Sequence, residues 1–274
     1  MLPQVVAHRG ASHEIAEHTL DAYVAALDAG AEALECDVRL TADGHLVCVH
    51  DRTLRRTANH PGVVSEMELA ELEELDFTSW KNGWSVEPDL ASPTGGVLTL
   101  HKLLETARDY GRRIEIAVET KHPTRYGGMV ERRLAEVLEE FDWHRAGSPV
   151  RVMSFNYTAL QRMDRYTPDL PKVLLIDKAQ YWPLLRGVIV GTEWSVGPGV
   201  KELLDHPKFA QRLLRTGRPI HAWTVNTDAE LEICLRLGVR AVITDRPAWA
   251  LGEVAKVAAR GQEVPSQDLL RTRS

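Results

Sequence analysis

Three acidic residues fall where strands of the sequence are expected to end. Glu35 and Asp37 are two residues apart, so on a strand both side chains point to the same face. Glu119 ends a later predicted strand and can add a third carboxylate. Buried carboxylates repel one another and need a cation, and oxygen-only ligation favours a hard divalent ion over zinc. We therefore expect one divalent cation, Mg²⁺ or Ca²⁺, at these three residues.

Two histidines are placed to move protons beside this cluster. His8 ends the first predicted strand next to Arg9, and His50 precedes Asp51. Imidazole titrates near neutral pH, so the two histidines can serve as general acid and general base. Arg9 offers a planar fork for phosphate oxygens, and Lys121 offers a point charge for the same anion. Together with a metal ion, these groups predict phosphoryl chemistry.

Alternating strands and helices are expected to position these residues. Short apolar, β-branched runs occur at 4–8, 33–38, 114–119, 150–154, 172–176, 188–192, 220–225 and 240–244. Amphipathic stretches lie between or after them at 17–29, 129–141, 156–166, 201–215, 228–237 and 247–259. Eight such units predict an α/β fold closed into a (β/α)₈ TIM barrel, whose active site lies at the C-terminal ends of the strands. The polar residues above fall at those ends.

Two stretches depart from this alternation. The apolar run 46–50 follows the second strand after only a few residues, and parallel strands need a longer crossover, so 39–51 is predicted to be an antiparallel hairpin excursion that brings His50 to the site. Residues 60–98 predict a small inserted cap, or alternatively a surface loop whose tryptophans pack down. We expect one barrel domain over 1–260 and a C-terminal tail over 261–274.

Seven short motifs occur in order along the chain: His8-Arg9-Gly10, Glu17-His18-Thr19-Leu20, Glu35-Cys36-Asp37-Val38, His50-Asp51 with Leu54 and Arg56-Thr57, Glu119-Thr120-Lys121, Trp223-Thr224-Val225-Asn226, and Thr244-Asp245-Arg246-Pro247. In this order they resemble the motifs of the glycerophosphodiester phosphodiesterase family, from about residue 5 to 250. One motif departs from the family pattern, because His18 stands where the family usually has Asn. Histidine can replace asparagine as a hydrogen-bond donor, so we expect activity to survive.

The resemblance implies roles for eight residues. Glu35, Asp37 and Glu119 would bind the metal, His8 and His50 would form the acid/base pair, Arg9 and Lys121 would contact the phosphate, and Trp223 would lie against the substrate. The implied reaction hydrolyses a small-molecule glycerophosphodiester to glycerol phosphate and an alcohol. A glycerol hydroxyl held close to phosphorus has a large proximity advantage, so we expect a cyclic phosphate on the way.

Other functions stay open at this point. A phospholipase-D-like relative acting on lysophospholipids or sphingolipids should show an apolar rim, for which Trp80, Trp84 and Trp182 are candidates. A non-catalytic barrel that binds a phosphorylated metabolite should lack a ligand or a histidine, and none is missing. An unrelated sugar-phosphate barrel should carry a glycine-rich loop after its seventh or eighth strand, which this sequence does not have.

Composition narrows the class of protein. The 274 residues are 44% hydrophobic and 26% charged, which is typical of a globular domain, and a net charge of -6 argues against a nucleic-acid partner. No apolar run approaches the ~20 residues that cross a bilayer, and no leader is evident, so we expect a cytoplasmic protein without stable membrane association. Cys36, Cys48 and Cys234 are predicted to be buried free thiols. The sequence does not indicate an oligomeric state.

Overall fold

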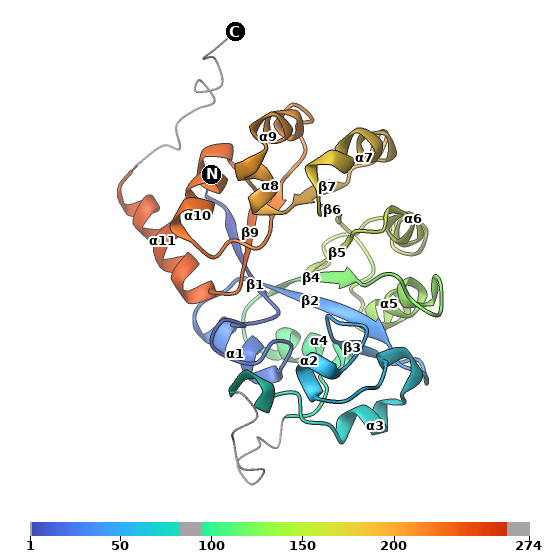
Figure 1. The fold of residues 1–274 in the computed structure, drawn as a ribbon. Coiled ribbons are helices and arrows are strands. Elements are labelled where there is room, and N and C mark those ends of the chain that lie inside the picture. Colours follow the sequence, from blue (N-terminus) through green and yellow to red (C-terminus); the bar gives the residue numbers. More distant parts are fainter. Residues whose placement is uncertain (1, 83–94, 262–274) are drawn as a thin grey trace.

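The computed structural model describes residues 2–82 and 95–261, and at its centre is a ring of eight parallel strands (Figure 1). Hydrogen-bonded neighbours follow the order β7-β6-β5-β4-β2-β1-β9-β8, and β3 pairs with β2 outside this path. Isolated parallel bridges, Val196 with Ile220 and Gly199 with Trp223, join β7 to β8 and close the ring. The predicted (β/α)₈ TIM barrel is confirmed.

The strands are short, as the apolar runs predicted. They are β1 (Gln4–His8), β2 (Ala33–Leu40), β3 (Leu46–Cys48), β4 (Glu115–Thr120), β5 (Val150–Ser154), β6 (Lys172–Ile176), β7 (Ser195–Pro198), β8 (His221–Ala222) and β9 (Ala241–Thr244). The α-helices surround them in Figure 1: α1 (Leu20–Asp28), α2 (Arg55–Ala58), α3 (Leu69–Glu73), α4 (Leu100–Asp109), α5 (Met129–Glu140), α6 (Tyr157–Tyr166), α7 (Trp182–Val188), α8 (Val200–Asp205), α9 (Pro207–Leu214), α10 (Asp228–Leu237) and α11 (Pro247–Ala259).

Alternating side chains separate an outer core from an inner one. Outward-facing residues of β2, such as Leu34 and Cys36, pack in the large core between strands and helices. A smaller core fills the inside of the ring with Val6, Ala33, Ala117, Met153, Val173, Leu175, Ala241 and Ile243. Because the side-chain period of a strand is two, Glu35 points to the same interior as Ala33. The inner core therefore lies beneath the predicted site.

The connection from β1 to α1 is tightly folded. Arg9 and Gly10 adopt positive φ angles of 57° and 91°, and the chain turns sharply after His8. Gly10 packs so closely on α1 that an added Cβ would lie 2.6 Å from the carbonyl carbon of Ala22. The Thr19 side chain then caps α1 by accepting a hydrogen bond from Ala22 N. This close packing fixes where β1 presents His8.

The predicted hairpin is confirmed. β3 runs antiparallel to β2 with Val38 opposite Cys48, and Val49 N donates to Asp37 O at 3.1 Å. The following 3₁₀ helices, Val64–Glu66 and Ser79–Asn82, and α3 belong to the segment predicted as a cap. A separate hydrophobic cluster anchors this segment to the hairpin, through Val47, Val49, Leu54, Ala58, Val64, Leu72, Phe77 and Val97. Residues 83–94 of the predicted cap and 262–274 of the predicted tail lie outside the described residues.

Two predicted elements were wrong. The run 188–192 is not a strand: Val188 ends α7, and the strand beside β6 is Ser195–Pro198. An apolar run at the end of an amphipathic helix resembles a strand, because periodicity cannot separate the two over five residues. The stretch 201–215 forms two helices, since Pro207 cannot donate a backbone hydrogen bond and begins α9 instead of continuing α8. Helix α4 was not predicted.

The expectation for the cysteines is confirmed. Cys36, Cys48 and Cys234 are free and buried. Thr227 and Glu230 form a capping box at the start of α10. Among the described helices, none has the length and apolar content needed to span a bilayer.

Candidate active site

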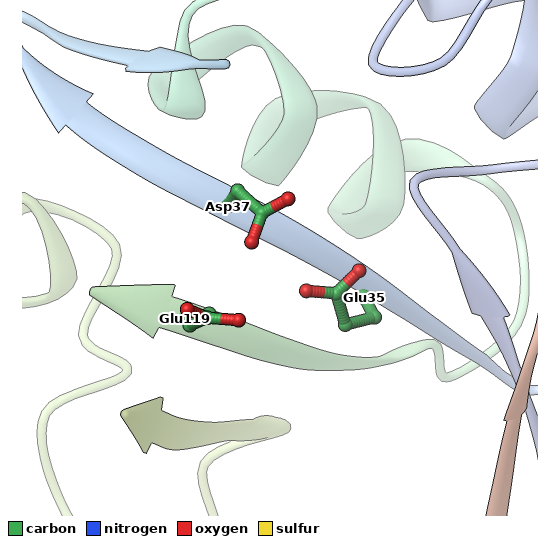
Figure 2. Close-up of side chains that lie close together, drawn as sticks. All are labelled: Glu35, Asp37 and Glu119. Carbon is green, nitrogen blue, oxygen red and sulfur yellow. The ribbon is translucent and has the colours of Figure 1, made fainter. Parts of the chain in front are cut away.

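A cluster of three buried carboxylates lies along β2 and at the C-terminal end of β4 (Figure 2). Glu35, Asp37 and Glu119 are 2%, 0% and 7% exposed, and one oxygen from each lies within 4.8 Å of the others. Asp37 and Glu119 are register partners on neighbouring strands, which is why they meet. The arrangement predicted from the two-residue spacing on β2 is present.

Two cationic side chains contact this cluster. Lys121 Nζ lies 2.7 Å from Glu119 Oε1 and 3.2 Å from Asp37 Oδ1, and Arg9 Nε lies 2.9 Å from Asp37 Oδ2. Burial alone would raise the pKa of Asp37, but Arg9 and Lys121 outweigh burial and hold it well below its usual range. Burial and the charge of Asp37 raise the pKa of Glu119 to about 8 despite Lys121.

The cluster has room for more positive charge. Burial and Asp37 raise the pKa of Glu35 well above its usual value, although Arg9 opposes them. Asp37 Oδ1 is buried, and within the described residues it has the ion-pair contact with Lys121 but accepts no hydrogen bond. Three carboxylates face two cations, and all three offer oxygen ligands, which suit a hard divalent ion. These side chains therefore fit a divalent metal.

His8 is oriented by the carboxylate of Asp245, the residue that follows β9. Its Nδ1 lies 2.6 Å from Asp245 Oδ1, while Nε2 lies 3.9 Å from Glu35 Oε2. Burial alone would raise the pKa of Asp245, but contacts with His8, Asn226 and Ser12 lower it to about 2. An ionised Asp245 only accepts hydrogen bonds, so His8 Nδ1 carries a proton and Nε2 is the atom that exchanges protons in the cavity.

His50 is oriented in the same way by its neighbour. His50 Nδ1 lies 2.7 Å from Asp51 Oδ1, and the Arg39 guanidinium donates twice to the His50 carbonyl, at 2.9 and 2.7 Å. Burial, with the charges of Arg9 and Lys121, lowers the pKa of His50 to about 4, although Asp37 and Asp51 oppose this shift. The ring is therefore neutral near pH 7 and available as a base.

Arg56 ties the His50 pair to the rest of the site. Its Nε donates to Asp51 Oδ2 at 2.7 Å, and its two terminal nitrogens donate to Glu17 at 2.8 and 2.7 Å. Glu17 also accepts from Arg9 Nη1 at 3.1 Å. The Arg56 guanidinium lies over the Trp80 ring, 5.3 Å from its centroid. Ion pairs thus run from Arg9 through Glu17 and Arg56 to Asp51, and a hydrogen bond joins Asp51 to His50.

His18, which departs from the family pattern, is buried beneath this network. Its Nε2 lies 3.0 Å from Asp37 Oδ2 and its Nδ1 lies 2.8 Å from Tyr23 Oη. Tyr23 in turn donates to the Glu35 carbonyl oxygen at 3.1 Å. An imidazole is long enough to connect Asp37 to Tyr23, so it fills the position with two polar contacts.

A cavity of about 270 Å³ opens over these groups and has two chemically different sides. One side is charged and includes the two histidines, Arg9 and Lys121. The other side is mostly apolar, with Met153, Phe155, Leu175, Trp223 and Ile243, and it also carries Asp177 and Thr224. Trp223 is held in place because its Nε1 donates to the Gly197 carbonyl at 2.7 Å and its ring meets Phe155 edge to face, with centroids 5.3 Å apart.

The structure brings all eight predicted site residues together. Seven line the cavity, and Asp37 lies behind them. No role was predicted for Asp245, Asp51 or Arg56, although each belongs to one of the seven family motifs. The adjacency of His50 and Asp51 was a readable signal, whereas the pairing of His8 with Asp245 spans 237 positions and needed the closed ring. Trp182, a candidate for an apolar rim, is buried, and Trp84 lies outside the described residues.

Comparison with known proteins gives a consistent result. A sequence model of the glycerophosphoryl diester phosphodiesterase family matches residues 8–249. A probable glycerophosphodiester phosphodiesterase 1 of Mycobacterium tuberculosis is 43% identical over 255 residues, covering 90% of this chain and 92% of that protein. The glycerophosphodiester phosphodiesterase of Bacillus subtilis is 31% identical, with 88% and 83% covered. A solved Oleispira antarctica phosphodiesterase, in complex with the product sn-glycerol-3-phosphate, has a TM-score of 0.78 at 25% identity, with 93% and 97% covered.

Proposed function

The chain belongs to the glycerophosphoryl diester phosphodiesterase family, and we propose that it hydrolyses glycerophosphodiesters to glycerol phosphate and an alcohol. The observation that carries this proposal is the pair of carboxylate-oriented histidines, which line one cavity with Glu35 and Glu119 of the acidic cluster. Proton transfer and charge neutralisation at one phosphate need these groups together.

The histidines divide the proton transfers. One takes the proton from a glycerol hydroxyl as that oxygen attacks phosphorus, and the other protonates the departing alcohol, which yields a cyclic phosphate. In the second step the two histidines exchange roles, and water attacks phosphorus and opens the cyclic phosphate. Asp245 and Asp51 keep each ring in the tautomer whose Nε2 faces the cavity, and they stabilise the imidazolium that forms.

Glu35, Asp37 and Glu119 would hold one divalent cation, Mg²⁺ or Ca²⁺. When bound, the cation supplies positive charge for the non-bridging phosphate oxygens. Arg9 and Lys121 line the same cavity and would contact those oxygens, with Arg9 kept in place by Glu17. Trp223 and Phe155 would lie against an organic part of the substrate, because their rings belong to the apolar part of the cavity lining.

A substrate panel tests the proposal. Glycerophosphocholine, glycerophosphoethanolamine and glycerophosphoglycerol are each assayed with Mg²⁺, with Ca²⁺ and with EDTA, and ³¹P NMR follows the cyclic phosphate. We expect turnover with a divalent cation and none with EDTA. Undiminished activity in EDTA would remove the metal from the scheme, and failure on every diester would remove the function.

Lysophosphatidylcholine belongs in the same panel, because a phospholipase-D-like activity was the alternative. We propose the smaller diesters as the preferred substrates, and one observation supports this: Trp182 packs in the core and cannot contribute to an apolar rim. Faster turnover of lysophosphatidylcholine than of glycerophosphocholine would reverse this preference. The cytoplasmic location expected from the sequence stays a prediction.

A further inference from the structure

A second cavity, of about 240 Å³, opens at the opposite mouth of the barrel, where the strands begin. It is lined by residues at the start of the strands, including Gln4 of β1, Glu115 of β4, Ser195 of β7 and His221 of β8. One layer of the inner core separates it from the active site, because Val173 lines this cavity and Leu175 lines the catalytic one. Barrel interiors are normally filled with side chains at this level, so a cavity nearly as large as the active site needs a reason.

Three charged side chains line this cavity: Arg151, Arg240 and Glu115. Arg151 Nη1 lies 2.9 Å from Glu115 Oε2 and 3.0 Å from Gln4 Oε1, so these two contacts use one of its nitrogens. Burial and the charges of Arg151 and Arg240 together lower the pKa of His221 to about 3. His221 is therefore neutral near pH 7 and can donate or accept a hydrogen bond.

Three buried nitrogen atoms in this lining have no hydrogen-bond partner among residues 2–82 and 95–261. Arg151 is 7% exposed, and its Nε and Nη2 are unpaired; His221 is 6% exposed, and its Nδ1 is unpaired. Buried polar groups are almost always satisfied, and an unpaired guanidinium is costly. Arginines at this end of a barrel can balance the negative C-terminal ends of the helices. That role does not account for buried nitrogens without partners beside a cavity.

We propose that this cavity binds a tetrahedral oxyanion, either inorganic phosphate or a phosphomonoester. Arg151 and Arg240 supply the charge, and the neutral His221 supplies a hydrogen bond. The volume is sufficient for a small phosphomonoester, and the site is separate from the catalytic cavity. This inference rests on the lining of the second cavity and does not depend on the proposed reaction.

Binding is tested in a background whose catalytic cavity is weakened for anions, Lys121→Met. Isothermal titration with inorganic phosphate and with glycerol phosphate, at constant ionic strength, distinguishes the two sources of the anion. Arg240 is exposed, so Arg240→Gln removes charge without disturbing the core. We expect Arg240→Gln to weaken binding at least tenfold. Ser195→Phe fills the cavity while both arginines remain, and we expect it to abolish binding.

The matched control is Arg236→Gln, which removes one exposed arginine from α10, away from this cavity. We expect it to bind like the Lys121→Met parent. Absence of binding in the parent, or equal weakening by Arg236→Gln and Arg240→Gln, would overturn the proposal. If Ser195→Phe does not fold, the comparison of Arg240→Gln with Arg236→Gln still tests whether the cavity binds the anion. In the wild-type background, Arg240→Gln should leave turnover unchanged.

Discussion

His8 and His50 reach the cavity from different elements, yet each is held by a carboxylate on Nδ1. This shared arrangement leaves Nε2 of each ring as the atom that exchanges protons. It also separates two jobs, because the ring moves the proton and the carboxylate sets its tautomer. Loss of a ring should therefore cost more than loss of its partner.

We predict that His8→Ala and His50→Ala each lower kcat by roughly 10²- to 10⁴-fold, the usual contribution of an acid–base group. Asp245→Asn and Asp51→Asn should each lower it by less than the matching histidine substitution. The control is His101→Ala on α4, an exposed histidine far from the cavity lining. Steady-state kinetics on glycerophosphocholine measures all five variants. Turnover within a few-fold of wild type for either histidine variant would contradict the scheme.

Arg56 should act through the groups it positions, since it contacts Asp51 and Glu17 and does not line the cavity. We predict that Arg56→Met lowers kcat by about 10-fold with a smaller change in KM, because transition-state alignment is lost. Arg56→Lys should recover little, since a single ammonium cannot reproduce the two-sided fork. Arg132→Met on α5 is the control for losing an exposed ion pair. Equal kcat values for Arg56→Met and wild type would sink the idea.

Residue types and spacing were enough to predict the acidic cluster and both histidines. Glu35 and Asp37 could be placed because strand periodicity fixes their common face. The partners of these residues could not be predicted. Whether Arg9 contacts Asp37, Glu17 or solvent depends on the conformation of one side chain after a positive-φ turn, which no local pattern encodes.

Among the elements, the β1–α1 connection depends most on one residue type. Gly10 combines a positive φ with a close approach to the backbone of Ala22. A side chain at this position would strain the backbone and also push α1 away from β1. Because His8 and Arg9 immediately precede it, this displacement would reach the active site.

We predict that Gly10→Ala lowers the free energy of unfolding by about 3 kcal/mol or more, from backbone strain plus overpacking. Gly44→Ala is the matched control, because Gly44 has a similar φ of 88° and no atom within 4 Å of an added Cβ. It should lose only roughly 1 kcal/mol, from strain alone. Urea denaturation of both variants measures the difference. Equal losses would show that the contact with Ala22 is unimportant.

Most elements could be predicted from their patterns, and the misplaced strand shows where patterns are insufficient. Ser195–Pro198 contains two residues that are poor strand formers, Gly197 and Pro198, and it becomes a strand because it pairs with β6. Val188 and Ile189 have better strand propensity and lie at the end of a helix instead. Pairing across the barrel outweighed local preference at both places.

In the molecule as a whole, three carboxylates are buried together on β2 and β4. Because their ionisation affects both metal binding and the free energy of unfolding, the two are coupled. Glu119 has a folded-state pKa of about 8, above its ordinary value of 4.5, so the metal-free folded state holds a proton that the unfolded chain releases. Its contribution to stability is complete below pH 4.5 and is lost as pH rises through about 8. The raised pKa of Glu35 acts in the same direction.

We predict that the Tm in EDTA falls between about pH 5 and pH 8 by more than it does with saturating Mg²⁺, because the cation binds ionised carboxylates and replaces the lost protons. Differential scanning calorimetry at several pH values measures the gap between the two curves. The Glu119→Gln variant is the control, since its side chain cannot ionise, and its Tm in EDTA should depend less on pH. A gap that does not widen with pH would contradict this coupling.

The number of paired residues between neighbouring strands varies around the barrel. β2 and β4 share six registered pairs, whereas β7 and β8 meet through two isolated bridges in the described residues. Local opening costs least where the fewest hydrogen bonds must break. Trp223 lies at this loosely tied junction, and the acidic cluster lies on the firmly tied pair of strands. We therefore expect the acidic half of the active site to be rigid and the half beside Trp223 to open locally, which would let it accept alcohols of different size. Amide protons of Val196 and Trp223 should exchange with deuterium sooner than that of Val118.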